Sequence, residues 1–393
     1  MKWNAPFALL AFGVALLTTS CSTSSRPPAT AGLTHTIPQS LLDAVYAVTN
    51  KFAPDGHVAI CRIEAVREDG HFALRGDVED AAARDEAMAA AARTGFDVRD
   101  RIEVLPDPAL ADHLWGIATL SVVNVREKPN NAGEMGTQML TGDCFRVWKR
   151  QTNWYLVQTP DRYVGWVEAG GFTNCARAGV DRWQAAPHLI VTAYDERILE
   201  QPDAGTMPVS DVVMGSQVEH LGESGAWFHV ALADGRSGWL PKTAAVDYQE
   251  WKASRQPTPE NIERTARLFL GRPYSWGCNS IRGMDCSGLT KFVFFLNGIE
   301  LSRNASQQCR EGVEVPLDND LRYLKKGDLL FFGRRAHDGK PERVDHTAIY
   351  LGDKLFIQAS ERVRISSLDS NSPLADPRRI QNLLHARRIL SEP

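Results

Sequence analysis

The stretch GRPYSWGCNSIRGMDCSGLTKFVFFLNG, residues 271–298, decides the fold of the C-terminal part of the chain. Its first half is rich in Gly and aromatic residues, which is typical of a loop. From Ser287 onward the apolar residues recur at helical spacing, and Gly298 ends the run. Cys286 is therefore predicted at a helix N-terminus, where unpaired backbone N–H groups and the helix dipole favour the nucleophilic thiolate over the thiol.

Two strands further along the chain can supply a base for this cysteine. His346 stands near the start of the apolar stretch VDHTAIYLG, and Gln358 lies in the middle of KLFIQAS, with a turn at Gly352-Asp353 between them. A hairpin of this kind can place the two side chains side by side on one face. Alone, either Cys286 or His346 is more often a structural residue. Together and in this order they predict a triad of nucleophile, general base and orienting amide.

Between residues 108 and 250 the sequence repeats itself. Residues 108–178 and 188–250 share a spacing of 13 positions from a Pro to a Gly and of 12 positions from one Trp to the next. Alternating strands with frequent turns are typical of a small barrel, and both copies resemble the bacterial SH3-like domain. We expect most of the Trp side chains to be core residues. The markers are Pro129, Gly142, Trp154 and Trp166 in the first copy, and Pro202, Gly215, Trp227 and Trp239 in the second.

Residues 37–107 are predicted to form a small α+β unit. Helical spacing in residues 40–51 is followed by two alternating strands, an Ala-rich helix that ends at Gly95, and a last strand. The order resembles small bacterial envelope domains of the BON type. No constellation of catalytic residues is visible in this unit, so docking or scaffolding is its expected role.

The first 36 residues read as an export signal and a linker. Residues 1–21 have a positive start, an apolar run too short for a membrane span, and small residues ahead of Cys21. This resembles a bacterial lipoprotein processing site, although Thr18 stands where Leu is usual, and plain secretion is the alternative. We expect Cys21 to be lipidated, residues 22–36 to be a tether, and the protein to be anchored in the cell envelope.

Composition narrows the possible functions. The chain of 393 residues is 43% hydrophobic and carries a net charge of −4, so it shows no electrostatic footprint for nucleic acid. It has seven Cys but no tight CxxC pair, so neither a zinc site nor a cofactor is predicted. An exported protein could join Cys144 to Cys175, but the spacing alone does not fix that pairing.

Five motifs in residues 256–393 resemble the NlpC-type cysteine peptidases, which are papain-like enzymes of bacterial cell walls. The family pattern PYxWGG, DCSGL, KxGDLxFF, HxxIYLG and a strand with a polar residue stands here as PYSWGC, DCSGL, KKGDLLFF, HTAIYLG and FIQAS. The resemblance implies a multidomain α+β chain with a small N-terminal unit, two SH3-like barrels and a papain-like catalytic domain. It implies Cys286 as nucleophile, His346 as general base and Gln358 as orienting residue, where His is more usual.

A subgroup of this family joins two SH3-like domains to the peptidase domain. It resembles γ-D-glutamyl-L-diamino-acid endopeptidases that act on peptidoglycan stem peptides with a free N-terminal L-Ala. The resemblance implies that Asp285, Tyr163 and Glu134 hold the substrate amine, and that Ser287 and Ser306 hold the D-Glu carboxylate. Tyr274 and Trp276 would line the site, and Tyr274 would assist the oxyanion together with the Cys286 N–H.

Two other functions fit the same motifs. An amidase or acyltransferase of this fold would use the same catalytic residues, although the SH3-like copies and Tyr163 favour the peptidase. A catalytically silent wall-binding lipoprotein would be the third reading, with Gln358 as a sign of decay. The intact Cys286 and His346 argue against it.

Overall fold

The computed structural model describes residues 36–391, and from Ile37 onward these residues belong to one unit of contacting elements. The predicted signal segment, Cys21 and nearly all of the predicted linker lie outside the described residues. Within residues 36–391 no helix is long and apolar enough to cross a membrane.

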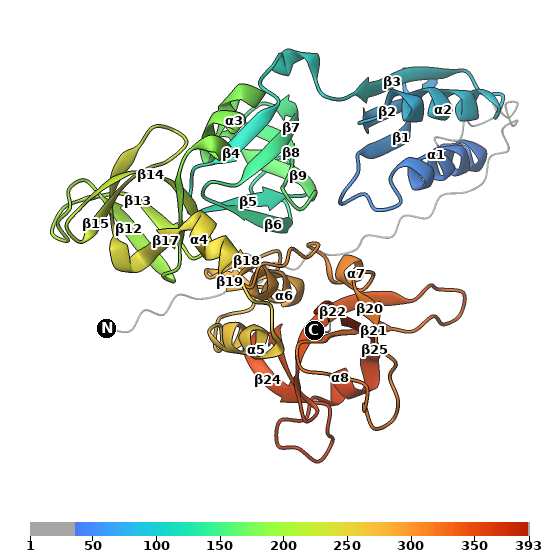
Figure 1. The fold of residues 1–393 in the computed structure, drawn as a ribbon. Coiled ribbons are helices and arrows are strands. Elements are labelled where there is room, and N and C mark those ends of the chain that lie inside the picture. Colours follow the sequence, from blue (N-terminus) through green and yellow to red (C-terminus); the bar gives the residue numbers. More distant parts are fainter. Residues whose placement is uncertain (1–35, 392–393) are drawn as a thin grey trace, which may run out of the picture. The chain divides into compact units, whose positions relative to one another are not determined.

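The first elements form a small α+β unit in the predicted order. Helices α1 (Gln39–Phe52) and α2 (Ala81–Ala92) pack on a sheet of β1 (Cys61–Glu68), β2 (His71–Val78) and β3 (Val98–Val104), as Figure 1 shows. Strand β2 pairs antiparallel with β1 and parallel with β3. Strand β1 begins three residues later than its alternating pattern suggests, because residues 58–60 belong to a loop that contacts the next sheet.

Two seven-stranded sheets follow, and they share one strand order. The first runs β10-β4-β7-β8-β9-β5-β6, and the second, read backwards, runs β17-β11-β14-β15-β16-β12-β13, so each strand has its counterpart seven places later. The first sheet comprises β4 (Trp115–Ala118), β5 (Val122–Arg126), β6 (Met135–Leu140), β7 (Cys144–Gln151), β8 (Trp154–Gln158), β9 (Val164–Glu168) and β10 (Phe172–Cys175). The second comprises β11 (His188–Val191), β12 (Asp195–Leu199), β13 (Pro208–Val213), β14 (Gln217–Ser224), β15 (Trp227–Ala231), β16 (Ser237–Pro241) and β17 (Ala245–Asp247).

The short helices around these sheets also recur. The 3₁₀ turns η2 (Ala169–Gly171) and η3 (Lys242–Ala244) precede β10 and β17, while η1 (Pro108–Leu110) leads into the first sheet. Helix α3 (Arg177–Ala185) joins the two sheets, and α4 (Tyr248–Ala253) leaves the second. Cys144 and Cys175, the possible disulfide partners, are both free thiols and lie in one apolar cluster beside α3.

The Trp pairs of the two sheets keep the same register but have different surroundings. Trp166 stands opposite Leu156, and Trp239 stands opposite His229 at the corresponding position. Trp154 and Trp166 are buried in one cluster with Leu156 and Val164 of their own sheet and with Ile60 and Leu105 of the small α+β unit. The expectation that most Trp residues are core residues is therefore confirmed for this pair, whereas Trp227 and Trp239 of the second copy are only partly buried.

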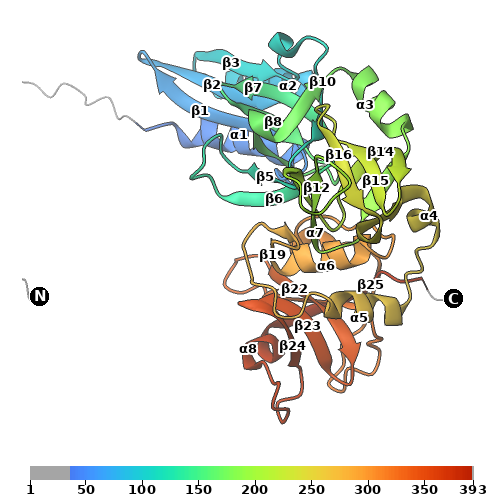
Figure 2. The ribbon, with the colours of Figure 1, turned by 90° about the vertical axis from the view of Figure 1, so that its left-hand side faces the viewer.

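The last part of the chain is a six-stranded sheet covered on both faces, in the order β20-β25-β21-β22-β23-β24 (Figure 2). Its strands are β20 (Val313–Glu314), β21 (Leu329–Arg334), β22 (Arg343–Gly352), β23 (Leu355–Ser360), β24 (Arg362–Ser367) and β25 (Leu383–Arg388). Its helices are α5 (Pro259–Arg267), α6 (Cys286–Phe295), α7 (Ala305–Gln308) and α8 (Pro377–Asn382), and β18 (Asn279–Ser280) pairs with β19 (Gly283–Met284) just before α6.

Alternation along β21 assigns its side chains to the two faces of this sheet. Phe331 packs with α5 and α6 in one core, and Phe332 packs in a second core with Ile380 of α8. Thr258 caps α5 by accepting a hydrogen bond from the Asn261 N–H at 3.2 Å. The chain therefore places α6 against one face of a sheet whose opposite face carries α8.

Candidate active site

Cys286 is the first residue of α6, as predicted, and its loop is held by close backbone contacts. Asp285 is the N-cap, and its Oδ1 accepts a hydrogen bond from the Gly288 N–H at 2.7 Å. A Cβ on Gly288 would lie 2.2 Å from the Cys278 carbonyl oxygen, so only glycine fits there. Cys278 is itself buried in this tight loop.

The surroundings of Cys286 favour its thiol over its thiolate. Burial raises its pKa to about 11, and the negative charge of Asp285 adds to that effect. Hydrogen bonds from the Thr347 and Ser287 backbones act in the opposite direction but do not outweigh it. Burial thus opposes the effect that the sequence predicts for the helix N-terminus, and desolvation is the larger of the two.

His346 and Gln358 lie side by side, as the hairpin predicts. His346 Nε2 lies 2.8 Å from Gln358 Oε1, and both side chains are buried. Burial, followed by the positive charge of Arg379, lowers the pKa of His346 to about 3. The imidazole is therefore neutral, and it can serve as a base.

The contacts of Gln358 fix the tautomer of His346. The Gln358 amide nitrogen donates to Ser366 Oγ and Asp376 Oδ2, both at 2.9 Å, so its oxygen must face His346. That oxygen also accepts from Arg379 Nε at 3.1 Å. Because Gln358 Oε1 only accepts, His346 Nε2 carries the proton, and Nδ1 is the basic nitrogen.

The thiol of Cys286 lies against the backbone of β22, the strand that carries His346. Cys286 is hydrogen-bonded to the backbone of Thr347, the residue that follows His346. Arg379 acts electrostatically on both groups, since it lowers the pKa of His346 and is itself affected by Cys286. A neutral thiol beside a neutral imidazole with a basic Nδ1 can transfer its proton as the sulfur attacks a carbonyl carbon.

Arg303 is a buried residue of the site that sequence reasoning missed. It pairs with Asp285 through two hydrogen bonds, one of them from Nη1 to Oδ1 at 3.1 Å, and also donates to Ser287 Oγ at 2.9 Å. Its Nε donates to Thr137 Oγ1 of β6 at 3.0 Å. The guanidinium therefore joins the nucleophile loop to the first SH3-like sheet and balances the charge of Asp285.

One pocket brings together most of the predicted residues. Cys286, Asp285, Ser287, Tyr163, Trp276 and Ser306 all line it, together with Glu127, Arg303 and His57. A second pocket adjoins it, shares the wall of Trp276, Arg343 and Asp345, and contains His346 and Tyr274. The catalytic pair thus stands between two binding spaces.

Glu134 does not line either of these pockets, and Glu127 takes the place that the sequence assigned to it. The two residues face each other across the β5–β6 hairpin, where the Glu127 N–H donates to the Glu134 carbonyl oxygen at 2.9 Å. Glu127 also acts on Tyr163: burial first, and then the charge of Glu127, raises the pKa of Tyr163 to about 12. Tyr163 is therefore a neutral phenol that can donate a hydrogen bond.

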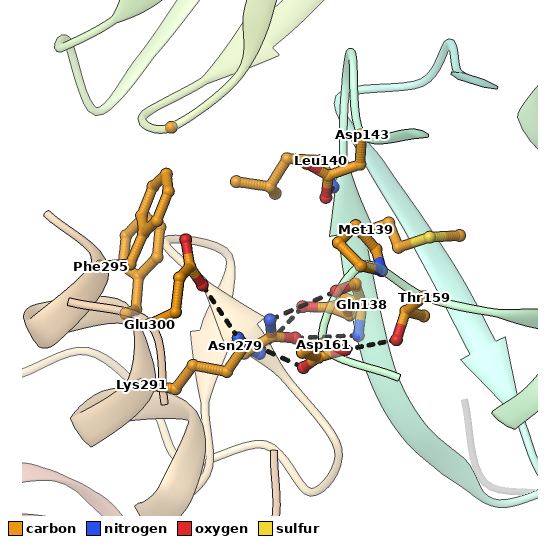
Figure 3. Close-up of a pocket in the computed structure, with 13 residues that line it drawn as sticks. Gln138, Met139, Leu140, Asp143, Thr159, Asp161, Asn279, Lys291, Phe295 and Glu300 are labelled. Atoms are coloured by element: carbon orange, nitrogen blue, oxygen red, sulfur yellow. Dashed lines mark hydrogen bonds and ion pairs between the residues drawn. The ribbon is translucent and has the colours of Figure 1, made fainter. Parts of the chain in front are cut away.

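The first SH3-like sheet is bonded directly to the loop before Cys286. Gln138 and Asn279 exchange hydrogen bonds, among them Gln138 N–H to Asn279 Oδ1 at 2.8 Å. A pocket apart from the catalytic pair lies at this junction, where Lys291 Nζ lies 3.2 Å from Asp161 Oδ2 (Figure 3). Burial raises the pKa of Asp143 in this pocket to about 7. Among residues 36–391 no group of His, Cys, Asp and Glu side chains is placed to hold a metal ion.

Comparison with known proteins agrees with this geometry. Residues 271–379 match the model of the NlpC/P60 family, and residues 125–171 match that of the bacterial dipeptidyl-peptidase SH3 domain. A Bacillus cereus protein named gamma-D-glutamyl-L-lysine dipeptidyl-peptidase is 30% identical, over 66% of this chain and 77% of the relative. The Lysinibacillus sphaericus protein named dipeptidyl-peptidase 6 is 31% identical, over 66% of this chain and 93% of the relative.

The chain belongs to the NlpC/P60 family. A solved NlpC/P60 structure from Bacillus cereus superposes with a TM-score of 0.59 at 25% identity, and covers 70% of this chain and 100% of its own. The C-terminal sheet with α6 is thus a papain-like cysteine-peptidase domain, and the first seven-stranded sheet is an SH3-like domain. The chain is a hydrolase of the cysteine-peptidase type.

Proposed function

We propose that this enzyme hydrolyses the bond between γ-D-Glu and the diamino acid in peptidoglycan stem peptides whose N-terminal L-Ala is free. The observation that carries the proposal is the pocket beside Cys286, where Glu127 and Tyr163 of the SH3-like sheet face Arg303 and Ser287. The names of the two relatives, gamma-D-glutamyl-L-lysine dipeptidyl-peptidase and dipeptidyl-peptidase 6, support the same substrate class.

The acyl part of the substrate is assigned to this pocket. Its ammonium group would pair with Glu127 and donate a hydrogen bond to the Tyr163 hydroxyl oxygen, since a buried ammonium requires anionic or dipolar partners. Asp285 contributes less charge than the family pattern implies, because Arg303 already neutralises it. The α-carboxylate of D-Glu would lie near Arg303, Ser287 and Ser306, where a guanidinium and two hydroxyls are available.

The diamino acid is assigned to the adjoining pocket that contains His346. Glu361 and Arg378 line that pocket, so groups of both charges are present for the zwitterionic end of the leaving residue. Tyr274 also lines this adjoining pocket. Burial, followed by the charges of Cys286 and Asp285, raises the pKa of Tyr274, so its phenol stays protonated. Its hydroxyl and the Cys286 N–H are the proposed oxyanion donors.

The reaction proceeds by acyl transfer. Cys286 Sγ attacks the γ-carbonyl carbon while its proton passes to His346 Nδ1, and a tetrahedral oxyanion forms. The C–N bond then breaks, and the imidazolium gives the proton to the leaving α-amine. Water activated by His346 cleaves the resulting thioester, which releases L-Ala-D-Glu and restores the thiol.

The direct test is product analysis with L-Ala-γ-D-Glu-diaminopimelate. The wild-type protein should release L-Ala-D-Glu and the free diamino acid, and Cys286→Ala should release neither while keeping the melting temperature of the wild type. Products cut at the L-Ala–D-Glu bond would contradict the proposed position of cleavage. No cleavage by folded wild-type protein would favour a silent binding role.

We also propose that Cys21 carries a lipid that holds the enzyme in the cell envelope. The proposal rests on the residues before Cys21, because this part of the chain lies outside the described residues. Labelled palmitate should be incorporated into the wild-type protein and not into Cys21→Ala, and the variant should move from the detergent-soluble membrane fraction to the soluble fraction. Equal labelling of both proteins would contradict the proposal.

A further inference from the structure

The loop between α1 and β1 reaches the pocket that holds Cys286. His57 of this loop lines the same pocket as Tyr163, and the centroids of the two rings are 5.5 Å apart. The loop belongs to the small α+β unit, which contains none of the catalytic residues. A segment far away in the sequence therefore forms one side of the substrate pocket.

Hydrogen bonds hold this loop on two sides. The His57 carbonyl oxygen accepts from the Val164 N–H at 2.6 Å, and the Val58 carbonyl oxygen accepts from Gln158 Nε2 at 3.0 Å. On the other side, Asp55 Oδ2 accepts from Gln307 Nε2 of α7 at 2.7 Å. The loop thus bridges the SH3-like sheet and the helix that carries Ser306.

Asp55 also sets the orientation of His57. Its Oδ1 accepts from the His57 N–H at 3.0 Å and lies 3.0 Å from His57 Nδ1. Burial opposes the charge of Asp55, but the bonds from Gln307 and His57 prevail and lower its pKa. With Nδ1 beside the carboxylate, Nε2 is the ring nitrogen that a substrate can meet.

The α+β unit is docked on the SH3-like sheet over an apolar and charged contact. Ile60 and Leu105 pack with the buried Trp154 and Trp166. Lys149 of β7 reaches Asp77 at 2.9 Å and Glu103 at 2.6 Å, two carboxylates of the α+β unit. A packed interface of this kind fixes the loop, so the position of His57 follows from the fold.

We propose that residues 54–58 form the end wall of the substrate pocket and that His57 is a specificity-determining residue, which limits the enzyme to peptides that end at the L-Ala amine. The inference rests on the proposed function and deepens it. An acyl group or further residue on that amine would extend past Tyr163 into the space of His57.

The first test compares substrates of two lengths. The full chain, His57→Ala and His71→Ala are assayed with L-Ala-γ-D-Glu-diaminopimelate and with the same peptide extended by an N-terminal Gly. His71 is the matched control, since it is a half-exposed histidine of the same unit and lies outside the pocket. In His57→Ala the kcat/KM ratio of extended to free peptide should rise by about tenfold, as for other pocket-shape changes. An unchanged ratio in His57→Ala, or an equal rise in His71→Ala, would overturn the proposal.

The second test does not require peptidase activity. Alkylation of Cys286 by iodoacetamide and by a bulky fluorescein maleimide is followed by peptide mass spectrometry in the same three proteins. His57→Ala should increase the rate with the bulky reagent relative to the small one, whereas His71→Ala should not. An equal ratio of the two alkylation rates in all three proteins would contradict the end wall formed by residues 54–58. If the wild type cuts no stem peptide but the alkylation ratio rises as expected, the proposed substrate fails and the end wall stands.

Discussion

Gln358 Oε1 and His346 Nε2 lie 2.8 Å apart, and the amide of Gln358 can be oriented in only one way, because its nitrogen donates to the Asp376 carboxylate. The neutral amide of Gln358 therefore determines which tautomer His346 adopts. It cannot stabilise an imidazolium as a charged partner would, and this agrees with a neutral thiol–imidazole pair at rest.

Removing the orienting amide should reduce the chemical step. Gln358→Ala is expected to lower kcat on the order of 10- to 100-fold with little change in KM, because the base loses its fixed tautomer and not its substrate contacts. Steady-state kinetics on the tripeptide measures this split. Ser366→Ala, which removes only one of the two acceptors of the Gln358 amide nitrogen, should have a smaller effect. A rise in KM with unchanged kcat would contradict the orienting role.

The pH–rate profile should respond to Arg379. Its positive charge lowers the pKa of His346, so Arg379→Met should raise that pKa. The base is active when neutral, and a higher pKa leaves more of it protonated in acid. The acid limb of kcat/KM should therefore move to higher pH in Arg379→Met, by more than in Arg378→Met, whose guanidinium is exposed and acts more weakly on His346. A shift to lower pH would contradict this assignment.

Breaking the buried ion pair should destabilise the fold. Arg303→Met leaves Asp285 without its guanidinium partner in a buried site, and the expected loss is about 3–5 kcal/mol of unfolding free energy. Denaturant titration measures it. The double variant Arg303→Met/Asp285→Asn should recover part of the loss, since the unpaired charge is then absent. A single-variant loss well below 1 kcal/mol would show that the pair is not what holds the loop.

The junction pocket predicts a pH-dependent stability. Burial raises the folded-state pKa of Asp143 to about 7 from an ordinary value of 3.8, so the folded state favours the protonated carboxyl. Stability from this group is fully present below the ordinary pKa and is lost as pH rises through the folded-state pKa. Between pH 4 and 8 the unfolding free energy of Asp143→Asn should fall by about 2 kcal/mol less than that of the wild type. This difference is smaller than the whole pKa shift would give, because the Asp143 side chain is only partly buried. If the stability of the two proteins changed equally with pH, the prediction for Asp143 would be contradicted.

The sequence predicted those parts of the fold and site that depend on residues close to one another in the chain. The helical spacing after Cys286 located α6, the turn between His346 and Gln358 brought those two side chains together, and the repeated Trp spacing revealed two sheets with one strand order. Each of these depends on neighbours in the sequence or on a short hairpin.

The parts that were missed depend on contacts between distant segments. Nothing near Arg303 in the sequence shows that it meets Asp285 and Thr137, because folding brings those residues together. His57 reaches the pocket through an interface with the SH3-like sheet, and its own unit shows no catalytic pattern. The charge state of Cys286 also depends on burial, which a helix-start motif does not report.

The most direct test is a side-by-side rate measurement with L-Ala-γ-D-Glu-diaminopimelate and its N-acetylated form. The wild-type enzyme should release the diamino acid from the free-amine peptide with a kcat/KM at least about 100-fold higher than from the acetylated one, because Glu127 and Tyr163 would lose their ammonium partner. Glu127→Gln should reduce that preference, and Cys286→Ala should cut neither peptide. Equal cleavage of both peptides by the wild type would contradict recognition of a free amine in this pocket.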